Sequence, residues 1–185
     1  APAASDWNIE ALNKTREWLH IRKLIGINKA GIGYGNISIR YEANRFLITG
    51  SSTGHLQTLG PEHYTLVTSF DHLKNNLFCT GPIQASSESM THGMLYRADS
   101  TINAVIHIHN EAMWRHFSGR IPTSDPSVPY GTPEMALEIE RLFKKTDLPY
   151  RKAMVMGGHF ECIITFGKSL DEALDLCKTL YDEVI

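Results

Sequence analysis

Hydrophobic and polar residues follow two periods along this chain, and the periods predict its helices and strands. Apolar residues three and four positions apart indicate helices, whereas alternation or short apolar runs between Gly and Pro indicate strands. Helices are expected over residues 5–30, 87–97, 132–145 and 169–180, with a brief helical turn at 60–62. Strands are expected over residues 37–40, 46–49, 64–70, 77–79, 103–110, 152–156 and 161–166. The turn at 42–44 indicates an antiparallel start to the sheet.

Polar and helix-breaking residues set the expected ends of these elements. Gly31 closes the first helix, and three prolines within 121–130 predict an irregular loop. The expected capping residues are Ser5 with Asp6, Ser87, Thr132 with Pro133, and Ser169 with Glu172 as a capping box.

Composition and charge place the chain among ordinary globular proteins. Its 185 residues suffice for a sizeable core, and we expect residues 1–185 to form a single domain. Apolar residues at 42% and charged residues at 21% argue against disorder and collagen-like repeats. With 18 basic against 20 acidic residues, the net charge is -2. The chain thus has no excess of positive charge to attract nucleic acid or an anionic membrane, so neither partner is expected.

The apolar runs and the cysteines further narrow the class of protein and its expected location. No run reaches the roughly 18 residues that cross a bilayer, and the N-terminus has no apolar signal core, so a cytoplasmic location is expected. Cys79, Cys162 and Cys177 are odd in number and form no Cys-x-x-Cys. They are expected to be core or surface thiols, because this pattern indicates neither disulfides nor a Cys-rich zinc site.

Two histidines one residue apart, His107 and His109, end the apolar strand at 103–110. Side chains two residues apart in a strand point to the same face and lie about 7 Å apart, so this pair can chelate a metal ion. Catalytic zinc sites commonly use three protein ligands, and His159, between two predicted strands, is the best candidate for the third. The other histidines stay open as alternatives, and they are His20, His55, His63, His72, His92 and His116.

Glu88 and His92 are four residues apart in the helix before the histidine strand, so they share one helix face. Glu88 could act as a general acid and base beside a metal, or the two residues could form a solvated surface pair. Ser86 and Ser87 at the helix start offer hydroxyl and N–H groups to an anion, or simply cap the helix. The Gly-rich stretch at 31–36 could bind an anion through its backbone.

Two glycine motifs lack the structural context that their signatures require. Residues 31–35 read Gly-x-Gly-x-Gly but follow a helix and precede a strand, the reverse of a dinucleotide site. Residues 50–54 match the Gly-x-Ser-x-Gly nucleophile elbow, yet Gly60 and Pro61 interrupt any helix after it. A serine hydrolase is therefore a distant alternative.

Six stretches of the chain, taken together with their order and spacing, form a pattern that is specific for one protein family. They are Gly35-Asn36-Ile37-Ser38-Ile39-Arg40, Ile48-Thr49, Ser86-Ser87-Glu88 with His92 and Tyr96-Arg97-Ala98, Asn103 to His109, Gly131-Thr132-Pro133-Glu134, and His159 ahead of Phe166-Gly167-Lys168. In these stretches the chain resembles the class II aldolase/adducin family, from about Leu12 to Asp182. The resemblance implies an α/β fold, a three-layer α/β/α sandwich around a mainly antiparallel sheet. It also implies a homo-oligomer, often a four-fold tetramer with active sites between subunits.

The same resemblance implies a site and a reaction. Zinc, or another divalent metal, would be held by His107, His109 and His159, with Glu88 beside it as the catalytic acid/base. The residues implied around the phosphate of a sugar-phosphate substrate are Asn36, Thr49, Gly50, Ser86 and Ser87. The expected function is a zinc-dependent aldolase-type lyase that cleaves a C–C bond of a ketose or ketose phosphate through a metal-stabilised enediolate.

Departures from the family pattern concern substrate handling. The connection from His109 to Gly131 is shorter than in sugar-phosphate aldolases, whose loop there carries a catalytic tyrosine, and we expect no tail tyrosine after Ile185. Tyr34 stands where the phosphate loop often has Ser or Thr, and Phe160 replaces a glycine. Two alternatives stay open: a sugar-phosphate epimerase or dehydratase on the same metal site, and a non-catalytic adducin-like binding module.

Overall fold

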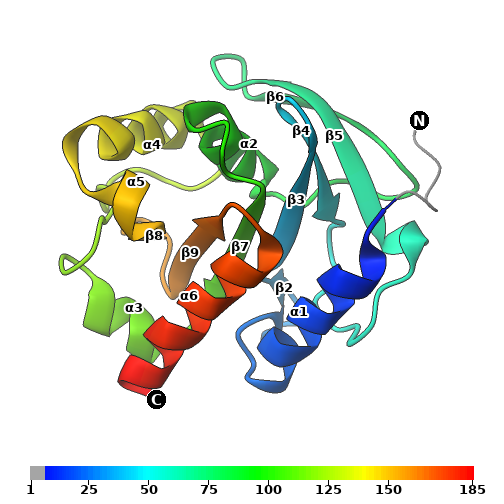
Figure 1. Ribbon diagram of the computed structural model, residues 1–185, viewed down its shortest axis with the longest axis horizontal. Coiled ribbons are helices and arrows are strands. Elements are labelled where there is room, and N and C mark those ends of the chain that lie inside the picture. Colours follow the sequence, from blue (N-terminus) through cyan, green and yellow to red (C-terminus); the bar gives the residue numbers. More distant parts are fainter. Residues whose placement is uncertain (1–6) are drawn as a thin grey trace.

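A seven-stranded sheet forms the middle layer of the computed structural model, which describes residues 7–185 (Figure 1). Its strands in spatial order are β6 (Asn76–Thr80), β5 (Tyr64–Asp71), β4 (Arg45–Thr49), β3 (Asn36–Glu42), β7 (Ala104–His109), β9 (Cys162–Gly167) and β8 (Ala153–Val155). All neighbours pair antiparallel. A separate two-stranded ribbon joins β1 (Gly26–Ile27) to β2 (Gly33–Tyr34).

Helices cover both faces of this sheet (Figure 1). One face carries α1 (Ile9–Ile21), α3 (Glu111–Phe117) and α6 (Leu170–Val184). The other carries α2 (Ser89–Ala98), α4 (Pro133–Lys145) and α5 (Leu148–Arg151). A short 3-10 turn, η2 (Pro61–His63), precedes β5. The predicted α/β/α sandwich with an antiparallel sheet is confirmed.

The central strand β7 divides the core into two clusters because its side chains alternate between the faces. Ile106 and Ile108 pack with the layer of α1 and α6, whereas Val105 packs with the layer of α2 and α4. His107 shares the face of Val105, and its neighbours in the sheet register are Asn36 on β3 and Ile164 on β9. The histidine pair therefore points toward α2 from the middle of the sheet.

The first helix is shorter than predicted. It ends at Ile21 instead of continuing to Gly31, and Lys23 has a left-handed backbone with φ 55°. Leu24 and Ile25 remain buried after the helix ends, so the apolar pattern continues without a helix. Asn8 is the N-cap, and its side chain accepts a hydrogen bond from a backbone N–H. The predicted cap Ser5-Asp6 lies outside the described residues.

The start of the second helix also differs from the prediction. α2 begins at Ser89, and Glu88 occupies the N-cap position without a side-chain cap bond, so Ser87 does not cap it. Two short helices, α3 and α5, were not predicted, because seven and four residues are too few to show a helical period. The predicted caps Thr132 and Ser169 are confirmed, since both side chains accept bonds from the first turns of their helices. The capping box with Glu172 is not formed, because the Glu172 carboxylate accepts a hydrogen bond from the N–H of Lys168 and not from that of Ser169. No helix in the described residues is long and apolar enough to cross a membrane.

Candidate active site

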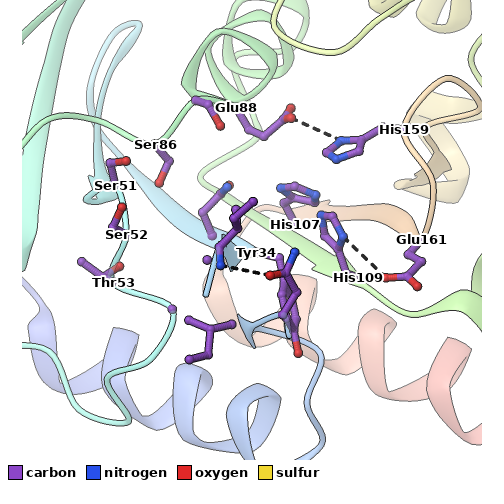
Figure 2. A pocket seen from close by; sticks show the side chains of 18 of the residues that line it. Tyr34, Ser51, Ser52, Thr53, Ser86, Glu88, His107, His109, His159 and Glu161 are labelled. Carbon is purple, nitrogen blue, oxygen red and sulfur yellow. Dashed lines mark hydrogen bonds and ion pairs between the residues drawn. The ribbon is translucent and has the colours of Figure 1, made fainter. Parts of the chain in front are cut away.

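The end of β7 and the turn before β9 bring three histidines together (Figure 2). His107 and His109 lie on the same face of β7, and His159 lies in the turn between β8 and β9. The centroids of their rings are 4.9, 4.9 and 5.8 Å apart. The three predicted histidines thus converge from segments that are 50 residues apart along the chain.

Two glycines allow the turn that carries His159 to approach a neighbouring loop. A Cβ atom at Gly157 would lie 2.2 Å from the carbonyl oxygen of Ser124, and one at Gly158 would lie 2.2 Å from that of Val128. Both distances are far inside van der Waals contact, so the close packing of the two backbones requires glycine. This packing sets the position of His159 beside β7.

Cys162 joins the three histidines through the pairing of two strands. It lies directly opposite His109 in the β7–β9 register, and residues opposite each other share one face of a sheet. Its buried Sγ is 2.8 Å from Nε2 of His107. The sequence predicted a core or surface thiol; the thiol is buried, and it also faces the histidines. The strand register that places it there could not be read from the cysteine spacing.

The donor set of this cluster fits a divalent transition metal. One ligand atom each from His107, His109, His159 and Cys162 lie within 4.8 Å of one another. Bonds of about 2.0–2.3 Å from nitrogen and sulfur to zinc hold ligand atoms no more than about 4 Å apart, so small side-chain rotations would bring this group to one ion. Nδ1 of His107 is buried and has no hydrogen-bond partner among the described residues, so the cluster is not satisfied by protein contacts alone. We therefore regard this cluster as a candidate metal site.

Burial keeps the imidazole rings of His107 and His109 neutral. Burial, followed by the neighbouring His109 and His159, lowers the pKa of His107 well below its ordinary value. Burial and His159 lower the pKa of His109 to about 4. Burial and then Glu88 raise the pKa of the Cys162 thiol well above its ordinary value. At neutral pH the two strand histidines therefore keep a nitrogen lone pair that a metal can use.

Glu88 lies beside His159 at the start of α2. Its side chain is almost fully buried, with the residue 2% exposed. Oε1 is 3.3 Å from Nδ1 of His159 without hydrogen-bond geometry, and Oε2 accepts a hydrogen bond of 3.2 Å from the Thr91 hydroxyl. One carboxylate oxygen is thus fixed by the helix, while the other faces the histidines.

His92 lies inside the protein, so the alternative of a solvated surface pair with Glu88 is wrong. The ring is fully buried between α2 and the sheet, and burial lowers its pKa to about 3. Its Nδ1 lies 2.6 Å from the Ser38 hydroxyl, which is 2.7 Å from the Tyr96 hydroxyl. The three side chains form a buried polar network behind His107. The helix face shared by Glu88 and His92 is turned toward the sheet, where Ser38 on β3 contacts His92, while Glu88 meets His159 of the turn before β9.

A cavity of about 1040 Å³ opens beside the histidines. Asn36, Gly50, Ser86 and Ser87, four of the five residues expected around a phosphate, line it. Thr49 lies behind this lining: its hydroxyl accepts a hydrogen bond of 3.3 Å from the backbone N–H of residue 37, and its carbonyl accepts one of 2.7 Å from Ser86. Thr49 therefore supports the wall of the cavity.

The mouth of the cavity carries side chains whose placement the sequence patterns did not give. The ring of Tyr130 stacks on that of His159, with centroids 4.0 Å apart and planes 18° apart. Glu161 has a left-handed backbone with φ 68°, and its Oε2 is 4.0 Å from Nδ1 of His109. Figure 2 shows Glu88 and Glu161 on opposite sides of the histidines. Tyr130 arrives from the irregular loop, where no periodicity indicates a position.

The remaining histidines are outside the four-residue cluster. His63 accepts a hydrogen bond from its own turn, His72 contacts Arg97, and His116 pairs with a glutamate of α6. His20 lies in the last turn of α1, and His55 contacts a carbonyl of the loop after β4. His159 is thus the third histidine beside the strand pair, as predicted.

The fold and the cluster define an α/β/α protein with a candidate metal site beside a buried carboxylate and a polar cavity. Residues 22–182 match the family described as the Class II Aldolase and Adducin N-terminal domain. The chain belongs to this family, which the order of its motifs predicted.

Solved structures share this architecture. The chain is similar to L-fuculose-1-phosphate aldolase from Thermus thermophilus, with 24% identity, a TM-score of 0.66, and coverage of 94% of this chain and 89% of that one. It is also similar to a sugar-phosphate aldolase from Thermotoga maritima, with 17% identity, coverage of 94% and 90%, and a TM-score of 0.66. The chain is similar as well to YgbL from Escherichia coli, for which an aldolase, epimerase or decarboxylase activity has been suggested. The identity is 19%, the TM-score is 0.68, and the match covers 94% of this chain and 84% of that one. At these identities the likeness shows the fold alone. A search of curated proteins returns no match.

Proposed function

We propose that this protein is a metal-dependent lyase of the aldolase type that cleaves a C–C bond of a ketose or ketose phosphate. The observation that carries the proposal is the position of Glu88 Oε1, 3.3 Å from Nδ1 of His159 in the histidine cluster. A carboxylate protected from water beside a candidate metal site is the arrangement that proton transfer at carbon requires. The family membership and the sugar-phosphate aldolases of the same fold support this choice.

His107, His109 and His159 would hold the divalent ion, and we propose zinc because imidazole nitrogens suit it. When bound, the ion supplies Lewis acidity that stabilises negative charge on substrate oxygen atoms. The protein contributes by burying the rings of His107 and His109, which keeps them uncharged and ready to bind. It also fixes the turn of His159 through the backbone packing of Gly157 and Gly158.

Glu88 would move the proton. Thr91 holds its Oε2, so Oε1 remains directed at the cavity side of His159. In the synthetic direction, Oε1 would remove a proton from the carbon beside the carbonyl group. In cleavage, the hydroxyl proton of the departing aldehyde carbon would leave to solvent, and the protonated carboxyl of Glu88 would return a proton to the carbon that keeps the electron pair of the broken C–C bond. A buried carboxylate with one fixed oxygen transfers a proton without first reorganising solvent.

The polar lining of the cavity would bind the phosphate. It includes two lysines beside neutral polar groups, and the residues are Lys23, Lys29, Asn36, Gly50, Ser86 and Ser87. Oδ1 of Asn36 is buried without a hydrogen-bond partner among the described residues, so this amide can meet a substrate hydroxyl. Hydroxyl and N–H donors near cationic side chains are the groups that bind a phosphate.

Metal analysis and product analysis test the proposal. Protein purified without chelator should hold close to one zinc, cobalt or manganese ion per chain, and the double variant His107→Ala/His109→Ala should lose it. Incubation with ketose phosphates should release dihydroxyacetone phosphate. Glu88→Gln should lower kcat by about 100- to 10,000-fold, whereas Glu10→Gln, on the exposed side of α1, should match the wild type. Metal content unchanged in the double variant would refute the site.

A second candidate is an epimerase or dehydratase on the same site. The observation that favours it is Glu161, whose carboxylate lies 4.0 Å from His109 on the side away from Glu88. Two carboxylates on opposite sides of a substrate can exchange protons on two faces. An isomeric sugar phosphate, or a product that has lost water, would identify this reaction in place of dihydroxyacetone phosphate.

We also propose that the protein assembles as a homo-oligomer of four chains. Ile27 and Ile32 line the cavity on the β1–β2 ribbon and are 48% and 63% exposed, which supplies apolar surface for a second copy. Sedimentation velocity would give the mass of the assembly, and a single species of 20.8 kDa would contradict the proposal.

A further inference from the structure

A thiol faces the candidate metal site where the proposed lyase would use three histidines. Cys162 begins β9, opposite His109 and diagonal to His107 in the sheet register. We propose that Cys162 is a fourth protein ligand, so that this site holds its divalent ion with three imidazoles and one thiolate. The inference rests on the metal binding of the proposed function and adds the ligand set and the kind of metal.

The position of the sulfur atom carries the inference. Sγ of Cys162 lies 2.8 Å from Nε2 of His107, and the ligand atoms of all four residues lie within 4.8 Å of one another. Two paired strands, β7 and β9, fix the backbone positions of His107, His109 and Cys162, so sheet pairing preforms most of the group. On metal binding the thiol would release its proton to solvent, give up its hydrogen bond with Nε2 of His107, and meet the same ion as the histidines.

The other cysteines of the chain provide an internal comparison. Cys177 is equally buried, but it lies in the apolar cluster between α6 and the sheet. Cys79 is exposed on the edge strand β6. Neither belongs to a group of metal-ligating side chains in residues 7–185. Cys162 therefore differs from an ordinary core thiol in what it faces.

The nearby carboxylate remains separate from this ligand set. Glu88 contacts His159 and Thr91 but is not part of the four-residue group. With a thiolate as the fourth ligand, Glu88 stays free for proton transfer. A substrate oxygen would then enter as a fifth ligand or replace the thiolate, since a four-ligand zinc site has no open position. Thiolate also favours zinc and cobalt over magnesium and manganese.

Cobalt absorption tests the inference directly, because sulfur-to-cobalt charge transfer absorbs in the near ultraviolet and imidazole ligands alone do not produce it. Metal-free protein is titrated with Co²⁺ and the spectrum is recorded up to one equivalent. The wild type, Cys177→Ser and Cys79→Ser should develop the charge-transfer band. Cys162→Ser should lack the band while it keeps the weaker visible bands of bound cobalt. Competition with a chelator should give at least about 10-fold weaker zinc binding for Cys162→Ser.

The outcomes separate this inference from the proposed function. Wild-type protein that binds cobalt without the charge-transfer band overturns the role of Cys162 and leaves the histidine site in place. A band that persists in Cys162→Ser overturns it as well. Wild-type protein that binds no cobalt overturns both proposals. The wild-type spectrum alone decides the matter if the Cys162→Ser chain does not fold, which far-ultraviolet circular dichroism would reveal.

Discussion

Replacing Ser38 with alanine tests the buried polar network behind the histidine cluster. The Ser38 hydroxyl lies 2.6 Å from Nδ1 of His92 and 2.7 Å from the hydroxyl of Tyr96, and all three side chains are buried. Removing it leaves two buried polar groups without a partner. Each such group costs about 1–3 kcal/mol, so we expect the free energy of unfolding to fall by about 2–6 kcal/mol.

The same network predicts a smaller loss of stability when the Tyr96 hydroxyl, which bonds only to Ser38, is removed. Tyr96→Phe takes away one hydroxyl but leaves Ser38 beside His92, so the loss should be about 0.5–1.5 kcal/mol. Ser100→Ala, at an exposed position, should change the stability by less than about 0.5 kcal/mol.

Urea unfolding of metal-free protein, followed by circular dichroism, measures all three variants. A Ser38→Ala chain that loses no more stability than Tyr96→Phe would refute the assignment of Ser38 as the shared partner.

Three further changes have expected outcomes. Gly157→Ala would place a Cβ atom 2.2 Å from the carbonyl oxygen of Ser124, so the turn that carries His159 should shift. The zinc affinity, measured by chelator competition, should then fall by about 10-fold or more. An unchanged affinity would contradict the role of this packing. Burial lowers the pKa of His92 to about 3, so the folded state favours the neutral ring, whereas the unfolded chain takes up a proton below about pH 6.5. The stability that the neutral ring contributes is therefore fully present above about pH 6.5 and is lost as the pH falls toward 3. Metal-free wild type should therefore lose about 1.4 kcal/mol per pH unit more than His92→Gln over that window, measured by urea unfolding, and parallel curves would count against it. Asn110→Ala removes the side-chain cap of α3 and should cost about 1 kcal/mol in the same assay, whereas no measurable change would show that the cap bond adds nothing.

Local patterns were sufficient for the seven strands of the main sheet and for part of the site, but not for the ribbon of β1 and β2, which falls within the predicted first helix and the Gly-rich stretch. The apolar run that ends in His107 and His109 gave both the strand and the face of its side chains, and the position of His159 between two predicted strands made it the candidate third ligand. The end of α1 could not be predicted because Leu24 and Ile25 stay buried after the helix and extend its apolar pattern. Burial after a helix end depends on tertiary packing, which a local window does not contain.

Long-range pairing explains the site residues that the sequence did not place. Cys162 meets His109 only because β9 pairs with β7 in one particular register. Tyr130 stacks on His159 from an irregular loop. A shift of the strand pairing by one residue would turn Cys162 to the opposite face of the sheet. Spacing in the sequence cannot distinguish such registers, whereas the order of family motifs does place the three histidines.

The last hairpin of the sheet has a consequence for the motion of the molecule. β8 is a three-residue strand at the edge, and the turn that follows it carries His159, while Cys162 begins its partner β9. An ion shared with His107 and His109 would tie this edge to the centre of the sheet as a removable cross-link. Amide hydrogens of residues 153–167 would then exchange more slowly in the metal-loaded protein than in the metal-free one, and loss of the metal would loosen the sheet from this edge inward.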